Sequence, residues 1–62
     1  MGDMRRLVGK RVVVKAAGVE YRGVLVELGL RDLVLRTRLG VHQIPWEQVG
    51  RVFEDRRLNP RR

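Results

Sequence analysis

Residues 18–36, with the sequence GVEYRGVLVELGLRDLVLR, constrain the fold more than any other part of the chain. They contain two runs rich in β-branched and aliphatic residues, separated by a turn that contains glycine. Arg11 to Lys15 is another β-prone run, and Ala17-Gly18 provides a turn between it and the next. The region therefore predicts consecutive antiparallel hairpins.

The same signals predict five strands along the chain, preceded by a short helical turn from Met4 to Val8 with Asp3 as its N-cap. The predicted strands are residues 11–15, 19–28, 33–38, 41–44 and 49–53. Pro45 ends the fourth strand because it has no amide donor, and Trp46 to Gln48 forms a tight turn. Five short strands indicate an all-β fold, either a barrel or a sandwich, and a length of 62 residues favours a small five-stranded barrel.

Alternation predicts which side chains face the interior. Val12 and Val14 are expected inside and Arg11, Val13 and Lys15 outside, with Ile44, Val49 and Phe53 filling the far side of the core. In the second strand Leu25 is expected inside and Val24, Val26 and Leu28 on the opposite face, so both faces are apolar. Either a bend at Gly23 lets one strand serve two halves of the barrel, or the strip is exposed and contacts a partner.

A chain this short has a thin margin of stability. A single core of this size seldom supplies more than roughly 3–5 kcal/mol, and the sequence has no cysteine for disulfides. Unpaired barrel edges also favour strand-to-strand assembly, so a ring or dimeric homo-oligomer is expected.

Without a signal-peptide apolar region or a run of transmembrane length, we expect a cytoplasmic protein with no membrane contact.

The charge balance indicates polyanionic partners. Twelve Arg and two Lys against seven acids give a net charge of +7. Serine and cysteine are absent, and Thr37 and His42 are the only residues of their types, so nucleophile-and-base chemistry lacks its parts. No catalytic activity, cofactor, metal or small-molecule substrate is therefore expected.

Seven residues are candidate contacts for nucleic acid. Arg36 and Arg38 are expected on one strand face with Arg31 in the adjoining loop, as a basic stripe, although a solvated outer face is the alternative for them. His42 and Trp46 carry rings that can stack on bases. The competing interpretations are a surface or interface histidine for His42, and a half-buried cap on the barrel or a subunit contact for Trp46. Arg56 and Arg57 begin a basic, flexible tail, residues 56–62, after a single domain over residues 1–55. Arg61 and Arg62 complete this tail, which either contacts phosphates or maintains solubility.

The motif spacing resembles the Sm-like (Lsm) family of small barrels from Leu7 through Val52. Leu7 to Val12 resembles the family's passage from helix to first strand, and Gly18 to Leu25 resembles the start of its first motif. Ile44, Val49 and Val52 keep the aliphatic spacing of its second motif. The resemblance implies a bent five-stranded barrel of the SH3-like type, in which the fourth strand pairs with the fifth strand of the next subunit. Ile44-Pro45-Trp46 also resembles the late strand of PRC-barrel domains, which makes that fold the second candidate.

The positions that read uridine in the family differ here. Gly29 lies about where the family has Asp, Leu33 lies near its Asn, and Pro45-Trp46 replaces its Arg-Gly pair. The sequence therefore predicts a non-catalytic module, an oligomeric Sm-like barrel that binds single-stranded RNA through arginine–phosphate contacts rather than base recognition. The alternative is a homo-oligomeric scaffold that presents a surface to proteins.

Overall fold

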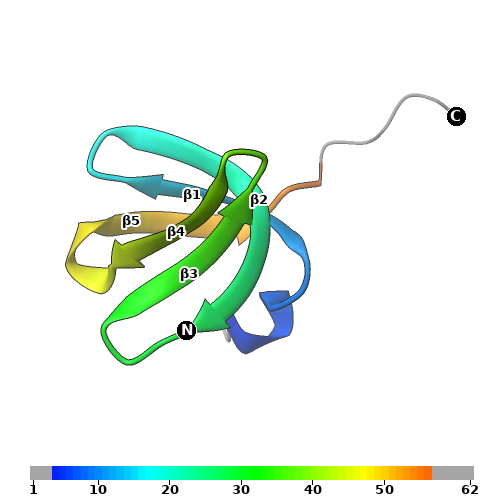
Figure 1. Ribbon diagram of the computed structural model, residues 1–62, viewed down its shortest axis with the longest axis horizontal. Helices are drawn as coiled ribbons and strands as arrows, with labels where there is room; N and C mark the ends of the chain where they lie inside the picture. The colour runs from blue at the N-terminus through cyan, green and yellow to red at the C-terminus, as the bar shows by residue number, and fades with distance from the viewer. Residues whose placement is uncertain (1–3, 57–62) are drawn as a thin grey trace, which may run out of the picture.

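The computed structural model describes residues 4–56, which form one antiparallel sheet of five strands (Figure 1). Its elements are η1 (Met4–Leu7), β1 (Arg11–Ala16), β2 (Val19–Leu28), β3 (Asp32–Thr37), β4 (Gly40–Pro45), η2 (Trp46–Gln48) and β5 (Val49–Glu54). The two η elements are single 3-10 turns, and the described residues contain no α-helix. The predicted all-β class and the five strands are confirmed. Asp3, the predicted N-cap, lies outside the described residues.

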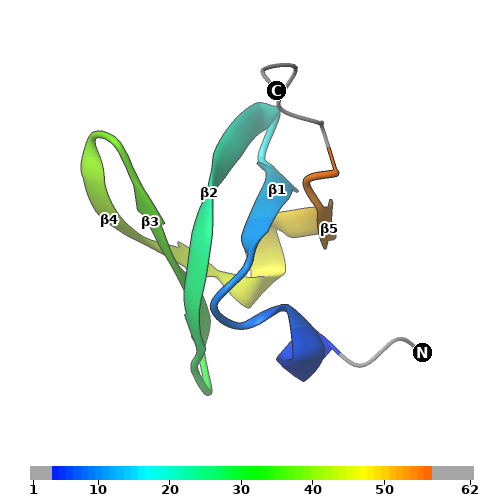
Figure 2. The ribbon, with the colours of Figure 1, turned by 90° about the vertical axis from the view of Figure 1, so that its right-hand side faces the viewer.

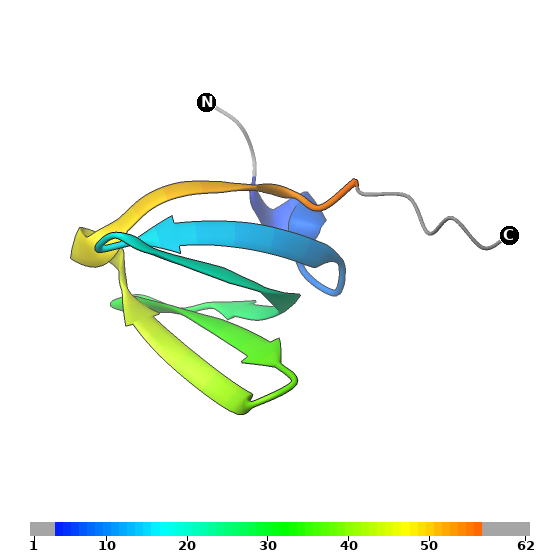
Figure 3. The same cartoon turned by 90° about the horizontal axis from the view of Figure 1, so that it is seen from above.

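The strand order in the sheet is β4-β3-β2-β1-β5. Figure 3 shows β1 and β5 diverging from β3 and β4, so the sheet is strongly curled. Within residues 4–56 no ladder joins β4 to β5, and these two strands remain the edges of an open sheet. The five strands thus form a curled sheet, without the full closure that a barrel requires.

Local backbone conformation explains the first hairpin. Ala17 and Gly18 both have positive φ, at 48° and 80°, which is the requirement of the two-residue type I′ turn. This turn matches the right-handed twist of the flanking strands and sets the register, in which Val14 lies opposite Tyr21 and Ala16 opposite Val19. The turn predicted at Ala17-Gly18 is therefore confirmed.

β2 serves two halves of the sheet, as predicted. Residues up to Val24 pair with β1, whereas residues from Val24 onward pair with β3. A register shift between Leu25 and Glu27 marks a bulge at Val26. Bulges bend a strand and increase its twist, so this bulge adds to the curvature of β2 just past Val24, where the strand changes neighbours.

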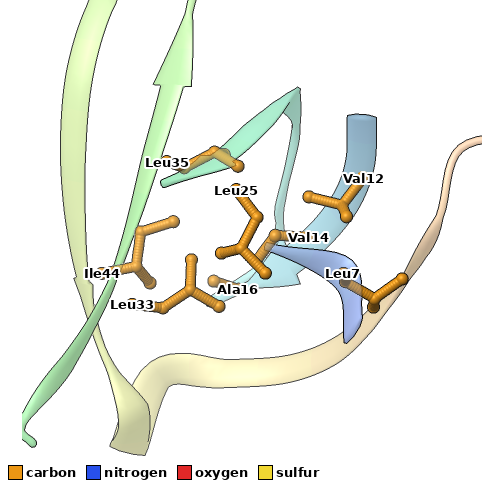
Figure 4. Close-up of a cluster of buried hydrophobic side chains, with 8 residues drawn as sticks. All are labelled: Leu7, Val12, Val14, Ala16, Leu25, Leu33, Leu35 and Ile44. Carbon is orange, nitrogen blue, oxygen red and sulfur yellow. The ribbon is translucent and has the colours of Figure 1, made fainter. Parts of the chain in front are cut away.

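The core lies inside the curl of the sheet (Figure 4). It consists of Leu7, Val12, Val14, Ala16, Leu25, Leu33, Leu35 and Ile44. Leu7 of η1 covers one side, where the amide of Gly9 donates to the carbonyl of Leu25 at 2.7 Å. The expected inward positions of Val12, Val14, Leu25 and Ile44 are confirmed. Trp46, Val49 and Val52 are partly buried against this cluster.

Two expectations about exposure are wrong. Val13 lies on the outer face, as predicted, but it is only 2% exposed, and Phe53 is 40% exposed instead of filling the core. Val13 lies opposite Arg22 on one side and Phe53 on the other, and a register shift that leaves Gly50 unpaired in the β1–β5 ladder turns Phe53 outward. Since β1 is an interior strand, these neighbours cover Val13 on the outer face. Val52, opposite Val14, packs against the core in place of Phe53.

Gly23 is required where β2 crosses from β1 to β3. A Cβ atom there would collide with the Arg36 carbonyl oxygen and would lie 3.0 Å from Thr37 Cγ2. We therefore expect Gly23→Ala to lower the free energy of unfolding by about 1–3 kcal/mol, because the two backbones must move apart. Urea unfolding followed by circular dichroism measures this loss.

Gly50→Ala is the matched control for this prediction. Gly50 is also a strand glycine without positive φ, and its added Cβ would lie 3.3 Å from the Lys15 carbonyl oxygen, a contact that a small shift relieves. We expect the Gly50 variant to unfold at a urea concentration close to that of the unmodified protein. Equal losses in the two variants would contradict the close approach at Gly23.

Candidate functional site

A hollow of about 790 Å³ opens where the first half of β2 separates from β3. The two strands are paired only from Val24 onward on β2 and up to Arg36 on β3. Beyond this point the β3–β4 hairpin bends away from the β1–β2 hairpin (Figure 2). The hollow is lined by Arg11, Val19, Glu20, Tyr21, Arg22, Gly23, Val24, Arg36, Thr37, Arg38, Leu39 and His42.

The charge in the hollow is positive. It contains four arginines and one carboxylate, that of Glu20. Arg22 is engaged, because its guanidinium lies 2.8 Å from Glu20 Oε2 and 3.4 Å from Asp55 Oδ2. Arg11, Arg36 and Arg38 are exposed, and none of them forms an ion pair with a carboxylate of the described residues. Three cations are therefore available to an anionic ligand.

The sheet register spaces two of these cations. Arg11 lies opposite Val24, and Val24 lies opposite Arg36, which in turn lies opposite Val41. Side chains directly opposite each other project from the same face, so Arg11 and Arg36 flank Val24 on the outer face. Strand spacing places their backbones about 10 Å apart. Each guanidinium has a planar fork of donors that matches a phosphate or carboxylate.

Two rings lie close together at the hollow. Tyr21 of β2 and His42 of β4 have ring centroids 5.5 Å apart and planes inclined by 55°. Both side chains are half-buried, and Tyr21 packs against the core. His42 lies opposite Leu35, and Tyr21 lies opposite Val14, so both belong to the inner face of the sheet. The two rings therefore line the hollow from the inner face of the sheet, whereas Arg11 and Arg36 line it from the outer face.

Three of the predicted site residues meet in this hollow: Arg36, Arg38 and His42. His42 lies on the strand next to Arg36, as expected. The expected position of Arg38 is wrong, because β3 ends at Thr37 and Arg38 lies in the turn before Gly40. The β3–β4 ladder pairs Thr37 with Gly40, which leaves two residues for the turn.

Arg31 lies in the loop before β3, as predicted, but neither Arg31 nor Trp46 lines the hollow, so the predicted stripe does not extend to Arg31. Arg31 precedes β3 and Arg38 follows it, so six strand residues separate them. The amide of Trp46 donates to the Arg31 carbonyl at 3.1 Å, and its indole Nε1–H donates to the Gly29 carbonyl at 2.8 Å. Trp46 is therefore a half-buried cap at the other end of the sheet, as one of the two interpretations predicted.

The basic tail contributes one described residue. Arg56 is exposed, and its Nε lies 3.9 Å from Glu54 Oε1. The other predicted tail contacts, Arg57, Arg61 and Arg62, lie outside the described residues.

Arg11, Tyr21 and Arg22 belong to the hollow although the sequence did not single them out. A hairpin register drawn from the Ala17-Gly18 turn would have placed Arg11 opposite Val24. The meeting of Tyr21 with His42 had no such signal, because β3 separates their two strands in the sheet order.

Comparison with protein-family models, with curated proteins and with solved structures finds no match to this chain. Across residues 4–56, none of the helical segments has the length and apolarity needed to cross a bilayer. In the same residues no three His, Asp or Glu side chains converge as a metal site would need.

Proposed function

We propose that this chain is a non-catalytic module that binds single-stranded nucleic acid, RNA above all, in the hollow between β2 and the β3–β4 hairpin. The supporting observation is that Arg11, Arg36 and Arg38 line the hollow without a carboxylate partner among the described residues. The net charge of +7 attracts a polyanion toward any basic surface, and the three guanidinium groups give it a defined place to bind.

Binding is expected to depend steeply on salt. Each phosphate neutralised on a single strand contributes about −0.7 to the slope of log affinity against log salt concentration. Contacts from the three free arginines alone therefore give a slope of about −2, and contacts from the tail make it steeper. Filter-binding titrations of poly-U, poly-A and mixed RNA over a range of salt concentrations measure this slope. Absence of affinity at low salt would contradict the proposal.

We also propose that the curled sheet has the Sm-like fold and self-associates through its edges. The supporting observation is that β4 and β5 are the two edges of the open sheet, each with an exposed apolar side chain, Val41 and Phe53 respectively. An unpaired edge presents backbone donors and acceptors to another chain. Pairing of β4 with β5 of a second copy satisfies both edges and repeats around a closed ring.

Light scattering at micromolar concentration tests this assembly. We expect the mass of a closed oligomer, independent of dilution across the micromolar range. Val41→Lys on β4 should shift the population toward monomer, because charges on an edge strand oppose strand addition. A stable monomer for the unmodified protein would contradict the proposal.

A scaffold that presents a surface to other proteins is the second candidate. Exposed apolar side chains favour it, since Leu30 and Leu39 are the most exposed large hydrophobic residues described. Leu39 also lines the hollow, and Leu30 lies in the connection between β2 and β3. Salt-dependent retention of RNA distinguishes the two candidates, because a protein scaffold does not require it.

A further inference from the structure

The rings of Tyr21 and His42 are placed where a ligand held by the arginines would meet them. Both rings line the hollow together with Arg36 and Arg38. Tyr21 comes from β2 and His42 from β4, and Thr37 ends β3 between them. The rings therefore lie beside the end of β3, within the same hollow as two of its free cations.

Thr37 holds the imidazole of His42 in one orientation. Thr37 Oγ1 accepts a hydrogen bond from the Leu39 amide at 3.0 Å, and it lies 3.1 Å from His42 Nε2 and 3.4 Å from the Gly40 carbonyl oxygen. All three contacts are satisfied together when Nε2–H donates to Oγ1 and the hydroxyl donates to Gly40. The turn itself thus positions the ring, and the ring needs no ligand to be ordered.

Aliphatic side chains complete the surface around the rings. Leu39 is 89% exposed, and Val19 is about half exposed; both line the hollow. An inorganic phosphate or an acidic side chain would use the arginines but leave these apolar surfaces in water. A ligand that matches the whole hollow carries negative charge and a flat, largely apolar group on the same unit. A nucleotide has both.

We infer that Tyr21 and His42 form a stacking platform for one unpaired base, whose flanking phosphates are held by Arg36 and Arg38. This inference rests on the proposed function and identifies how the hollow distinguishes its ligand. Base–aromatic stacking contributes about 1–3 kcal/mol per base and tolerates any base, because every base has a π-face. In a duplex both faces of each base are covered by its neighbours, so the platform selects single strands.

The test compares one short RNA with the same RNA lacking its bases, the abasic chain, and with its duplex. For the unmodified protein we expect the abasic chain and the duplex to bind about 5- to 150-fold more weakly than the single strand, the equivalent of 1–3 kcal/mol. Tyr21→Leu and His42→Leu should reduce affinity for the RNA within that range and leave affinity for the abasic chain unchanged. The salt dependence should keep its slope, because no phosphate contact is removed.

Tyr21→Phe is the conservative control and should retain full affinity, because phenylalanine keeps the ring. Circular dichroism melts establish that each variant is folded, and His42→Leu gives the measurement if Tyr21→Leu disturbs the core.

Thr37→Val should weaken RNA binding, because it removes the hydroxyl that holds the ring of His42. Thr37→Ser keeps the hydroxyl and should not weaken RNA binding.

Equal binding of RNA and abasic chain by the unmodified protein would overturn the platform and leave the arginine contacts intact. Equal loss of both ligands in His42→Leu would also overturn it. Absence of binding to either ligand at low salt would instead overturn the proposed function as a whole, and the platform with it.

Discussion

Leu25→Asp is expected to leave the chain unfolded at room temperature. Leu25 is fully buried and lies opposite Leu35 in the centre of the core, among the side chains labelled in Figure 4. No described cation belongs to this cluster, so the new carboxylate would have no partner there. The penalty for burying an unpaired charge is several kcal/mol, which exceeds the roughly 3–5 kcal/mol that a single core of this size supplies.

Val26→Asp is the matched control for this loss. Val26 is the next residue along β2, but it is 43% exposed and lies at the bulge. The same carboxylate remains in water there, so we expect a change of about 1 kcal/mol or less in the free energy of unfolding. Far-ultraviolet circular dichroism and thermal melts compare the two variants. Similar behaviour of the two would show that Leu25 is not in the core.

Replacing Arg11, Arg36 and Arg38 together with glutamine is expected to cause the largest loss of nucleic-acid binding. Exposed ionic contacts contribute roughly 0.5–1 kcal/mol each, so three give about a 10- to 150-fold weaker affinity at low salt. The slope of log affinity against log salt should become about 2 units flatter. All sequences should weaken about equally, because phosphate contacts do not read bases.

The control replaces Arg6, Arg31 and Arg51 with glutamine. These three arginines are also exposed, but they do not line the hollow. Their replacement lowers the net charge from +7 by the same three units. If the hollow is the binding site, this variant should retain most of the affinity and slope. Equal losses in the two triple variants would show that only the overall charge matters, and the hollow would then have no special role.

The secondary structure elements could be predicted from the sequence alone. The turn at Ala17-Gly18, the end of β4 at Pro45 and the boundaries of β2 all follow from local preferences of the backbone, which act over a few residues. The apolar residues on both faces of β2 also predicted that this one strand serves two halves of the fold. Alternation then placed Val12, Val14 and Leu25 in the core correctly, because the sides of a strand follow from its period of two.

Alternation predicted neither the burial of Val13 nor the exposure of Phe53. Phe53 leaves the core because a register shift in the β1–β5 ladder breaks the period of two between Val49 and Val52. A period of two assigns opposite sides, but it does not say whether the outer side is covered. Val13 is buried because β1 lies between β2 and β5, which bring Arg22 and Phe53 over it. The order of strands in the sheet decides such burial, and that order depends on contacts between segments far apart in the chain.

The candidate site divides in the same way. Composition alone shows an excess of arginine and a lack of serine and cysteine. The excess of arginine predicts polyanionic partners, and the lack of serine and cysteine argues against nucleophilic catalysis. Only the tertiary structure shows that Arg36 and His42 line the hollow whereas Arg31 and Trp46 do not. The contact between the rings of Tyr21 and His42 is likewise visible only in the tertiary structure. Side-chain charge and local backbone conformation are properties of single residues and short segments, so they can be predicted from the sequence. The hollow exists because β2 leaves β3 at Val24, and that divergence is a property of the whole curled sheet.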